Sequence, residues 1–455
     1  MRLDEYLETV SEQIRYAKIR STVTEELKNH ILDQAEAYEE CGAFPEEALE
    51  RAVREMGDPV ETGVALDRIH RPQMNWGIVA AIAVLSIFSI GVCYAANIVA
   101  HDIYSWQKHA LYTVIGFIMM LVFYRMDYSI LAKFQWKSCV FYFGLIMLGY
   151  LMFGQEVNGM RRWIVTPFLP FGVSVSEAML LYVPLFGATL YSFRGDGYNV
   201  LWKVIPLIII PAFFVFRIPD LSAAVILFTC LFCLFIFAVW KDWYQISKKA
   251  IIGISGGIVL LTPLAFLGYF YFFGQPYQSD RIRAFFTQGS NGDYIINMAK
   301  NMREHSALLG SSSKSIEWFA NGPTTDFLTD YILVSMCSIY GTLLTVAVIV
   351  GLLLIIMKVF HISVTQKNQL GMIVGTGCGL AFFIKTALGI LMNLQLIPYV
   401  SISMPFLSYG GSGTVVSYIL LGLVLSIYRY KNILPNRPEN IKKRHLRLKL
   451  TWETR

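Results

Sequence analysis

The chain has 455 residues, of which 55% are hydrophobic and only 15% are charged. Soluble globular proteins carry about 25% charged residues, so this composition excludes an ordinary soluble enzyme and indicates a membrane protein. The formal net charge of +6 is too small to indicate a nucleic-acid partner, and we expect none.

Residues 1–73 differ from the rest because they are rich in charged side chains and have no apolar core of the signal-peptide type. Pro45 followed by two glutamates is typical of a helix start, since the acids lie at the positive end of the helix dipole. Asp58 before Pro59 predicts another start, in which the aspartate caps the helix. We predict that residues 1–73 form a small soluble helical domain in the cytoplasm.

Long apolar runs follow this domain. A helix needs about 20 apolar residues to cross a bilayer, and lipid forces the backbone to satisfy its hydrogen bonds internally. We therefore predict an all-α polytopic membrane protein whose membrane domain covers 74–430. About ten transmembrane helices are expected, at 75–98, 108–124, 137–154, 178–193, 200–216, 220–240, 249–274, 329–357, 371–393 and 411–428.

Positive charges give the predicted orientation, because cationic loops stay in the cytoplasm. Lysines and arginines concentrate in the loops on the N-terminal side and in a basic tail, 431–455, whereas the short loops on the other side hold few. Both termini are therefore predicted to be cytoplasmic. The outer segments are then 155–177, a large loop at 275–328, and 394–410.

Four polar or aromatic residues of the first outer segment form a candidate phosphate site: Asn158, Arg161, Arg162 and Trp163. Guanidinium groups match phosphate in a bidentate way, so the two adjacent arginines could clamp one phosphate. The alternative is interfacial anchoring, with the tryptophan at headgroup level and the arginines snorkelling.

Three ionisable residues lie at or within predicted spans. Glu177 begins the fourth span. Its carboxylate is either stabilised there by the positive end of the helix dipole, or it is an acid of the site that orients Arg161 and Arg162. Asp220 either caps the sixth span or faces the site. Lys385 lies inside the ninth span, where an ionisable group indicates function and needs a partner or a wet cavity, unless it snorkels.

Two segments precede the eighth and tenth spans. Asp326 and Asp330 are four residues apart and fall on one side of a helix start, where they either face a site or cap the helix.

In 404–413, a Gly-Gly pair permits close approach of other groups to the backbone, and non-helical backbone at membrane depth is tolerated where it lines a cavity. The candidate binding residues there are Ser408, Tyr409, Gly410, Gly411 and Ser412.

In this order the motifs resemble the SEDS family (shape, elongation, division and sporulation proteins of the RodA and FtsW type). The resemblance covers about 75–430. It is carried by Asn158-Gly-Met-Arg-Arg-Trp-Ile, Ser176-Glu177, Pro219-Asp220-Leu221, Thr329-Asp330-Tyr331-Ile332, Asn393 between Met and Leu, and Pro405-Phe-Leu-Ser-Tyr-Gly-Gly-Ser.

The resemblance implies a peptidoglycan glycosyltransferase of the bacterial cell membrane. Such an enzyme polymerises lipid II at the outer face and releases undecaprenyl pyrophosphate. Asp330 would be catalytic, as general base on the acceptor hydroxyl or as ligand of a divalent cation, Mg²⁺ or Mn²⁺. Arg161 and Arg162 would hold pyrophosphate, and the other residues named above would bind substrate. Membrane lipids and a single-pass class B penicillin-binding transpeptidase are the implied partners.

The chain departs from the family pattern at several positions. The family's lysine three residues after Glu177 is missing, and we hypothesise that Lys385 replaces its charge. The departures leave open a flippase for a lipid-linked precursor, or a non-catalytic scaffold that binds lipid II. Residues 1–73 resemble the prefix domain of some bacterial permeases. The departing positions are Leu180, Ser222, Leu328, Ser338 and Ile339.

Overall fold

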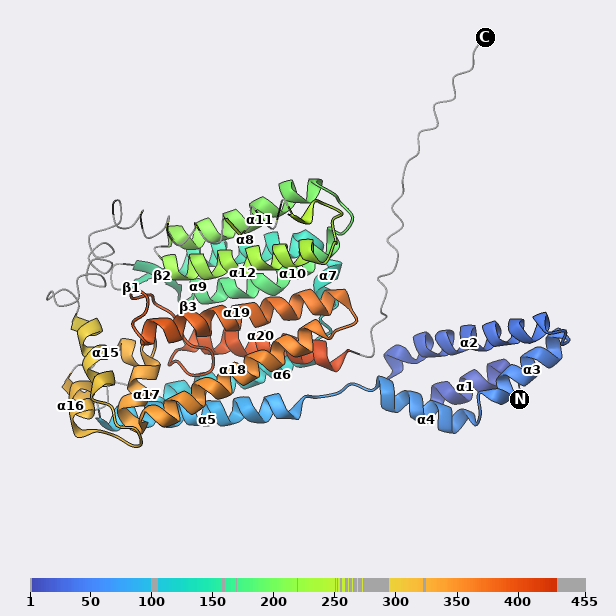
Figure 1. Ribbon diagram of the computed structural model, residues 1–455, viewed down its shortest axis with the longest axis horizontal. Coiled ribbons are helices and arrows are strands. Elements are labelled where there is room, and N and C mark those ends of the chain that lie inside the picture. The colour runs from blue at the N-terminus through green and yellow to red at the C-terminus, as the bar shows by residue number, and fades with distance from the viewer. Residues whose placement is uncertain are drawn as a thin grey trace, which may run out of the picture. The chain divides into compact units, whose positions relative to one another are not determined.

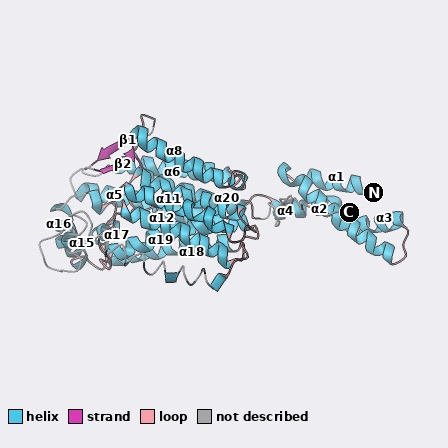
Figure 2. Ribbon diagram, turned by 90° about the horizontal axis from the view of Figure 1, so that it is seen from above, coloured by secondary structure: helices cyan, strands magenta, loops and turns pink. Residues whose placement is uncertain are grey.

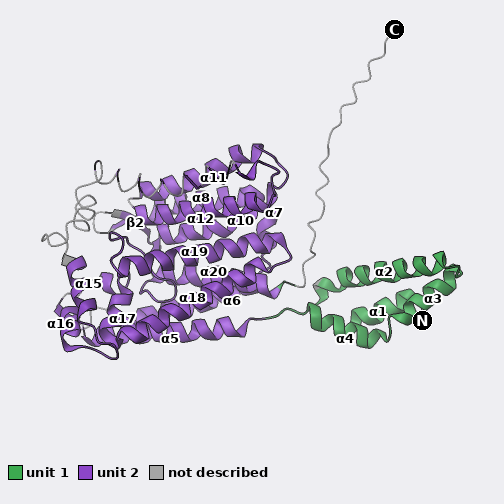
Figure 3. Cartoon of the chain, viewed as in Figure 1, with its two compact units in different colours: residues 1–73, 430–455 green, residues 74–429 purple. Residues whose placement is uncertain are grey.

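The computed structural model describes residues 2–99, 105–157, 160–168, 170–218, 220–249, 294–321 and 325–431, with isolated residues between 251 and 272. It contains two compact units, one of residues 1–73 with 430–455 and one of residues 74–429 (Figure 3). The basic tail predicted at 431–455 lies outside the described residues except for Lys431.

The first unit is helical, as predicted. Tyr6, Val10 and Ala52 are buried in its core. The Asp58 side chain accepts a 3.3 Å hydrogen bond from the backbone N–H of Glu61 and caps the last helix. The helices are α1 (Leu3–Gln13), α2 (Ala17–Glu40), α3 (Pro45–Glu55) and α4 (Pro59–His70).

Within its described residues, the second unit has eight helices that are long and apolar enough to cross a membrane. They run side by side (Figures 1 and 2). The outer helices expose large apolar side chains such as Phe141 and Trp202, as expected for contact with lipid tails. The eight helices are α5 (Trp76–Val99), α6 (Trp106–Arg125), α8 (Gln135–Phe153), α11 (Asn199–Arg217), α12 (Leu221–Trp240), α18 (Thr342–Val364), α19 (Gln369–Asn393) and α20 (Gly411–Arg429).

Three of the predicted spans need comment. The span predicted at 178–193 is built from α9 (Val175–Ala178), η1 (Met179–Leu181) and α10 (Tyr182–Ser192). The span predicted at 329–357 is wrong as a single helix, because Gly341 separates α17 (Ile332–Tyr340) from α18. Gly341 has φ of 92°, and a side chain there would meet backbone atoms at 2.9 Å, so the helix cannot continue through it. The span predicted at 249–274 lies outside the described residues.

The first segment that was predicted to lie outside, 155–177, contains most of a small sheet that the all-α prediction did not include. Strands β1 (Gly154–Val157), β2 (Met160–Ile164) and β3 (Val173–Ser174) pair antiparallel in that order. The Asn-Gly dipeptide between β1 and β2 in the sequence is a signal for a hairpin, and we did not use it.

Helices from the loop 275–328, which was predicted to lie outside, lie against the start of the eighth predicted span. They are α15 (Tyr294–Glu304) and α16 (Ser313–Asn321), followed by η2 (Thr325–Phe327). Ser315 Oγ lies 2.8 Å from Met302 O and 2.8 Å from Ser338 Oγ. Ser338, one of the positions that depart from the family pattern, therefore joins α17 to α16 by a hydrogen bond.

Candidate active site

The small sheet and helices α15 to α17 lie at one end of the bundle (Figure 1). The polar side chains of the candidate site make hydrogen bonds between several segments. They come from the turn after η2, the end of α19, the loop 394–410, and the starts of α9 and α12. Segments that are distant in the sequence thus meet at one end of the membrane helices.

Asp330 lies in the turn between η2 and α17, and its side chain is buried. The backbone N–H groups of Asp330 and Tyr331 both donate to Asp326 O at 2.9 Å and close the turn. The Tyr399 hydroxyl donates a 2.6 Å hydrogen bond to Asp330 Oδ2. Burial raises the pKa of the Asp330 carboxyl to about 6, although the Tyr399 hydrogen bond opposes the rise and the charge of Asp326 adds to it.

The backbone around Asp330 is held by three residues from the predicted site. Asn393 Nδ2 donates to Asp330 O at 2.9 Å. Ser408 Oγ donates to Thr329 O at 2.5 Å, and Tyr409 N donates to Leu328 O at 2.8 Å. These contacts fix the turn that carries the carboxylate, and the substrate contacts expected of the three residues stay a prediction.

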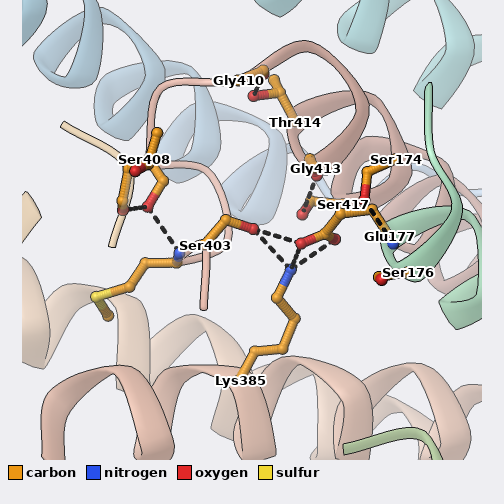
Figure 4. A network of polar contacts seen from close by, with 12 residues as sticks. Ser174, Ser176, Glu177, Lys385, Ser403, Ser408, Gly410, Gly413, Thr414 and Ser417 are labelled. Carbon is orange, nitrogen blue, oxygen red and sulfur yellow. Dashed lines mark hydrogen bonds and ion pairs between the residues drawn. The ribbon is translucent and has the colours of Figure 1, made fainter. Parts of the chain in front are cut away.

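Lys385 and Glu177 form a buried ion pair (Figure 4). Lys385 Nζ lies 2.8 Å from Glu177 Oε1 and 2.7 Å from Oε2. It also donates to Ser403 Oγ at 3.0 Å, and Ser403 in turn donates to Glu177 Oε1 at 2.6 Å. An ionisable group inside a span needs a partner, and Glu177 is the partner of Lys385. The family pattern has a lysine three residues after this glutamate, and in this chain the Lys385 charge lies beside the glutamate instead.

A second polar group joins the starts of α9 and α12 to strand β2. Ser176 Oγ donates to Asp220 Oδ2 at 2.6 Å. Asp220 Oδ1 accepts a 3.1 Å hydrogen bond from Ala223 N, so Asp220 caps α12. Arg162 Nη1 lies 3.9 Å from Asp220 Oδ2. Asp220 is close enough to Asp330 for its charge to raise the pKa of Asp330 slightly.

The two adjacent arginines have different partners in the structure. The pairing of β1 and β2 shifts register here, with Glu156 opposite Arg161 and Gln155 opposite Trp163, so Arg162 is the extra residue of a β-bulge. Arg161 Nε donates to Gly154 O at 2.9 Å, and Nη2 contacts Tyr150 O and Leu151 O at 3.2 and 3.1 Å. Arg161 thus caps the C-terminal end of α8, where a cation is favoured. The two-arginine clamp on one phosphate stays a prediction, while Arg161 is engaged with backbone carbonyls.

The remaining predicted residues have packing roles or lie elsewhere. Asn158 lies outside the described residues. Trp163 is half-buried on β2 and pairs with Ser174 of β3. At Gly411 a side chain would meet the Phe171 ring at 2.7 Å, so this glycine permits close packing as predicted. Gly410 and Ser412 flank it, and Ser412 is buried.

Comparison with known proteins gives the family. The sequence model of the FtsW, RodA and SpoVE family, described as cell cycle protein, matches residues 71–433. The chain belongs to this SEDS family.

Curated relatives and solved structures support the same assignment. A peptidoglycan glycosyltransferase MrdB from Helicobacter pylori is 25% identical and is matched over 84% of its length and 72% of this chain. A probable peptidoglycan glycosyltransferase FtsW from Alcanivorax borkumensis is 24% identical over 92% of its length and 78% of this chain.

Two solved structures share the fold of the SEDS domain. A chain from a study of polymerization and crosslinking by a peptidoglycan synthase complex superposes with a TM-score of 0.62 and 18% identity, covering 98% of that chain and 78% of this one. RodA from Thermus thermophilus superposes with a TM-score of 0.55 and 16% identity, covering 97% and 79%.

Within this SEDS site, our sequence reasoning missed Tyr399 and Ser403. Each is a single polar residue in an irregular loop, and neither belongs to a motif or a periodic pattern that would indicate a function. The available signal was indirect: a buried ionisable group needs a partner, and the loop 394–410 joins the span that carries Lys385 to the following one. Searching that loop for hydroxyl groups would have found both residues.

The predicted divalent cation has few protein ligands. Among the residues that the structure describes, no group of three or more His, Cys, Asp or Glu side chains could hold a metal ion. Asp330 and the neighbouring Asp326 offer carboxylates, and Mg²⁺ often binds through one or two carboxylates together with substrate phosphates. These residues therefore fit a cation that is shared with a pyrophosphate, but not a site formed by the protein alone.

Proposed function

We propose that this chain is a peptidoglycan glycosyltransferase that polymerises lipid II at the outer face of the cytoplasmic membrane, in cell shape, division or sporulation. The observation that carries the proposal is the buried Asp330 carboxyl, with a pKa of about 6, in a member of the SEDS family. A general base works best when its pKa lies near the operating pH. The relatives MrdB and FtsW carry this activity in their names.

In the proposed reaction, Asp330 accepts the proton of the acceptor sugar hydroxyl. The acceptor oxygen forms a bond to the anomeric carbon of the donor, and the bond from that carbon to the pyrophosphate oxygen breaks. The electron pair leaves on the pyrophosphate, which remains attached to the polyprenyl lipid. A displacement of this kind needs one base and stabilisation of the leaving charge.

Arg162 is the proposed contact for the leaving pyrophosphate. Its described ionic contact, with Asp220, is 3.9 Å long, so the guanidinium retains donors for phosphate oxygens. Arg161 is engaged with three backbone carbonyls of its own hairpin and α8. We therefore assign the phosphate contact to Arg162 and a structural role to Arg161.

A divalent cation, Mg²⁺ or Mn²⁺, is part of the proposal only as a group shared between Asp330 and the substrate. When bound, it would supply positive charge for the developing pyrophosphate. Asp330 and Asp326 are the residues that would hold it. Removal of divalent cations by a chelator should then slow polymerisation without unfolding the protein.

We further propose that both termini lie in the cytoplasm of a bacterial cell and that a single-pass class B penicillin-binding transpeptidase is the partner. The distribution of lysine and arginine between the loops supports this orientation. The partner is supported by the similar chain that was solved in a complex for polymerization and crosslinking. Labelling of single cysteines near each terminus from either side of the membrane would test the orientation.

The function itself is tested with purified protein in vesicles containing fluorescent lipid II, with and without a candidate transpeptidase. Formation of glycan polymer is the expected result. Movement of lipid II between leaflets without polymer would instead indicate the flippase, and binding of lipid II with neither polymer nor movement would indicate the scaffold.

A further inference from the structure

The loop 394–410 contacts two polar groups that belong to different elements. Tyr399 donates to Asp330 Oδ2 at 2.6 Å. Ser403, in the same extended stretch, donates to Glu177 Oε1 at 2.6 Å and accepts from Lys385 at 3.0 Å (Figure 4). Residues 398–404 have no regular secondary structure, so tertiary contacts position this segment, and for Tyr399 they include a stack on the Tyr331 ring with centroids 5.7 Å apart.

The Lys385 ammonium is fully engaged by the protein. An ammonium has three N–H donors, and the described contacts supply three acceptors, Glu177 Oε1, Glu177 Oε2 and Ser403 Oγ. The Lys385 side chain is 5% exposed and that of Glu177 is 18% exposed. Lys385 therefore has no donor left for a sugar or a phosphate, which argues against the predicted role in substrate binding.

The first turn of α20 covers the ion pair. A Cβ at Gly413 would lie 3.0 Å from Ser403 Oγ and 3.5 Å from Glu177 Cδ. A buried ion pair seldom adds net stability, because the loss of solvation offsets the attraction, and in some proteins it instead fixes the arrangement of the groups around it. Here that arrangement includes Ser403 and the loop that carries Tyr399.

We propose that Lys385, Glu177 and Ser403 form a positioning unit for the reaction at Asp330. The ion pair holds Ser403, Ser403 holds the loop, and the loop keeps the Tyr399 hydroxyl on the Asp330 carboxylate. The three residues touch no reacting atom. The inference rests on the proposed function, in which Asp330 is the base.

The test compares lipid II polymerisation by wild type, Lys385→Met, Tyr399→Phe and the double variant of the full chain. Each single change is expected to lower kcat about 10-fold while the KM for lipid II stays within about 2-fold. Residues that act through one another are non-additive, so the double variant should be no slower than the slower single variant. The proposal would be overturned if the loss of kcat in the double variant equalled the product of the two single losses. It would also be overturned if Lys385→Met raised KM and left kcat unchanged.

The pH profile provides a readout that loss of folded protein would not move. Four groups face the Asp330 carboxyl: the Tyr399 and Ser401 hydroxyls lower its pKa, and the Asp326 and Asp220 charges raise it. Loss of the Tyr399 contact, directly or through Lys385→Met, should therefore move the acid limb of kcat/KM to higher pH. If Tyr399→Phe shifts the acid limb of kcat/KM and Lys385→Met does not, then Lys385 does not act through the Tyr399 contact and the proposal is contradicted.

Two controls keep the outcome interpretable. Lys385→Met combined with Glu177→Gln leaves no unpaired charge, so it should fold normally by size-exclusion chromatography and still show the shifted acid limb. Lys203→Met removes a surface ion pair of 2.7 Å with Asp196 and should leave kcat unchanged. An inactive wild type would contradict the proposed function, whereas an active wild type with additive variants would contradict the positioning unit alone.

Discussion

The Tyr399 hydroxyl lies 2.6 Å from Oδ2 of Asp330, although 69 residues separate them in the sequence. This contact joins the loop before α20 to the turn before α17. The proton affinity of the proposed base therefore depends on a loop that is itself held by Ser403 and Ser408.

The first prediction concerns pH. A general base must be deprotonated, and the pKa of Asp330 is about 6, so kcat/KM should fall about tenfold per pH unit below that value. The Asp326 charge raises this pKa, so Asp326→Asn should move the acid limb to lower pH. Polymerisation rates from pH 5 to 8 would check both. A wild-type profile that is flat down to pH 5 would contradict the assignment.

The second prediction concerns stability. The folded state raises the pKa of Asp330 from 3.8 to about 6, so it binds more protons than the unfolded state between these values. Its contribution to stability then falls as pH rises through this window. Asp330→Asn removes the buried charge and should stabilise the protein at pH 7.5 by up to about 3 kcal/mol, with little effect at pH 4. Thermal melting in detergent at both values is the measurement.

The third prediction separates the two arginines. Arg162→Gln should lower kcat/KM about 10- to 100-fold, as expected for loss of a charged contact to the leaving group, with an unchanged melting temperature. Arg161→Gln should instead lower stability by about 1 kcal/mol, because it removes the cap of α8, with a smaller loss of rate. Equal kinetic defects with no loss of stability would favour a joint phosphate clamp.

The fourth prediction concerns the break between α17 and α18. Gly341→Ala would force a side chain into a conformation with φ of 92° and a 2.9 Å contact with backbone, so a loss of at least about 2 kcal/mol is expected. Gly351→Ala in α18 is the matched control, because a Cβ there meets nothing within 4 Å. It should stabilise the helix slightly. The same melting temperature for both variants would show that the break is not required.

The membrane helices could be predicted from the sequence because apolar length alone determines them, as for α5 and α12. The break at Gly341 could not, since it depends on the backbone of 308–310 packing against that glycine. The β-hairpin around Arg161 could have been predicted from its Asn-Gly signal.

Within the site, the sequence indicated Lys385 because an ionisable group inside a span needs a partner, and it indicated Asp330 through its place at a helix start and the family motif that contains it. Their partners Tyr399, Glu177 and Ser403 depend on tertiary contacts between α9, α19 and the loop 394–410. Pairings of this kind have no local sequence signal. For the same reason, the hydrogen bonds by which Asn393 and Ser408 hold the backbone of the Asp330 turn could not be predicted, and their assignment to substrate binding stays a prediction.

The most direct measurement is polymerisation of fluorescent lipid II by purified wild type, Asp330→Asn and Asp326→Asn, at equal amounts of folded protein. The account predicts polymer from wild type, a reduced but measurable amount from Asp326→Asn, and none from Asp330→Asn, although Asp330→Asn still binds lipid II. Polymer from Asp330→Asn at the wild-type rate would contradict the account.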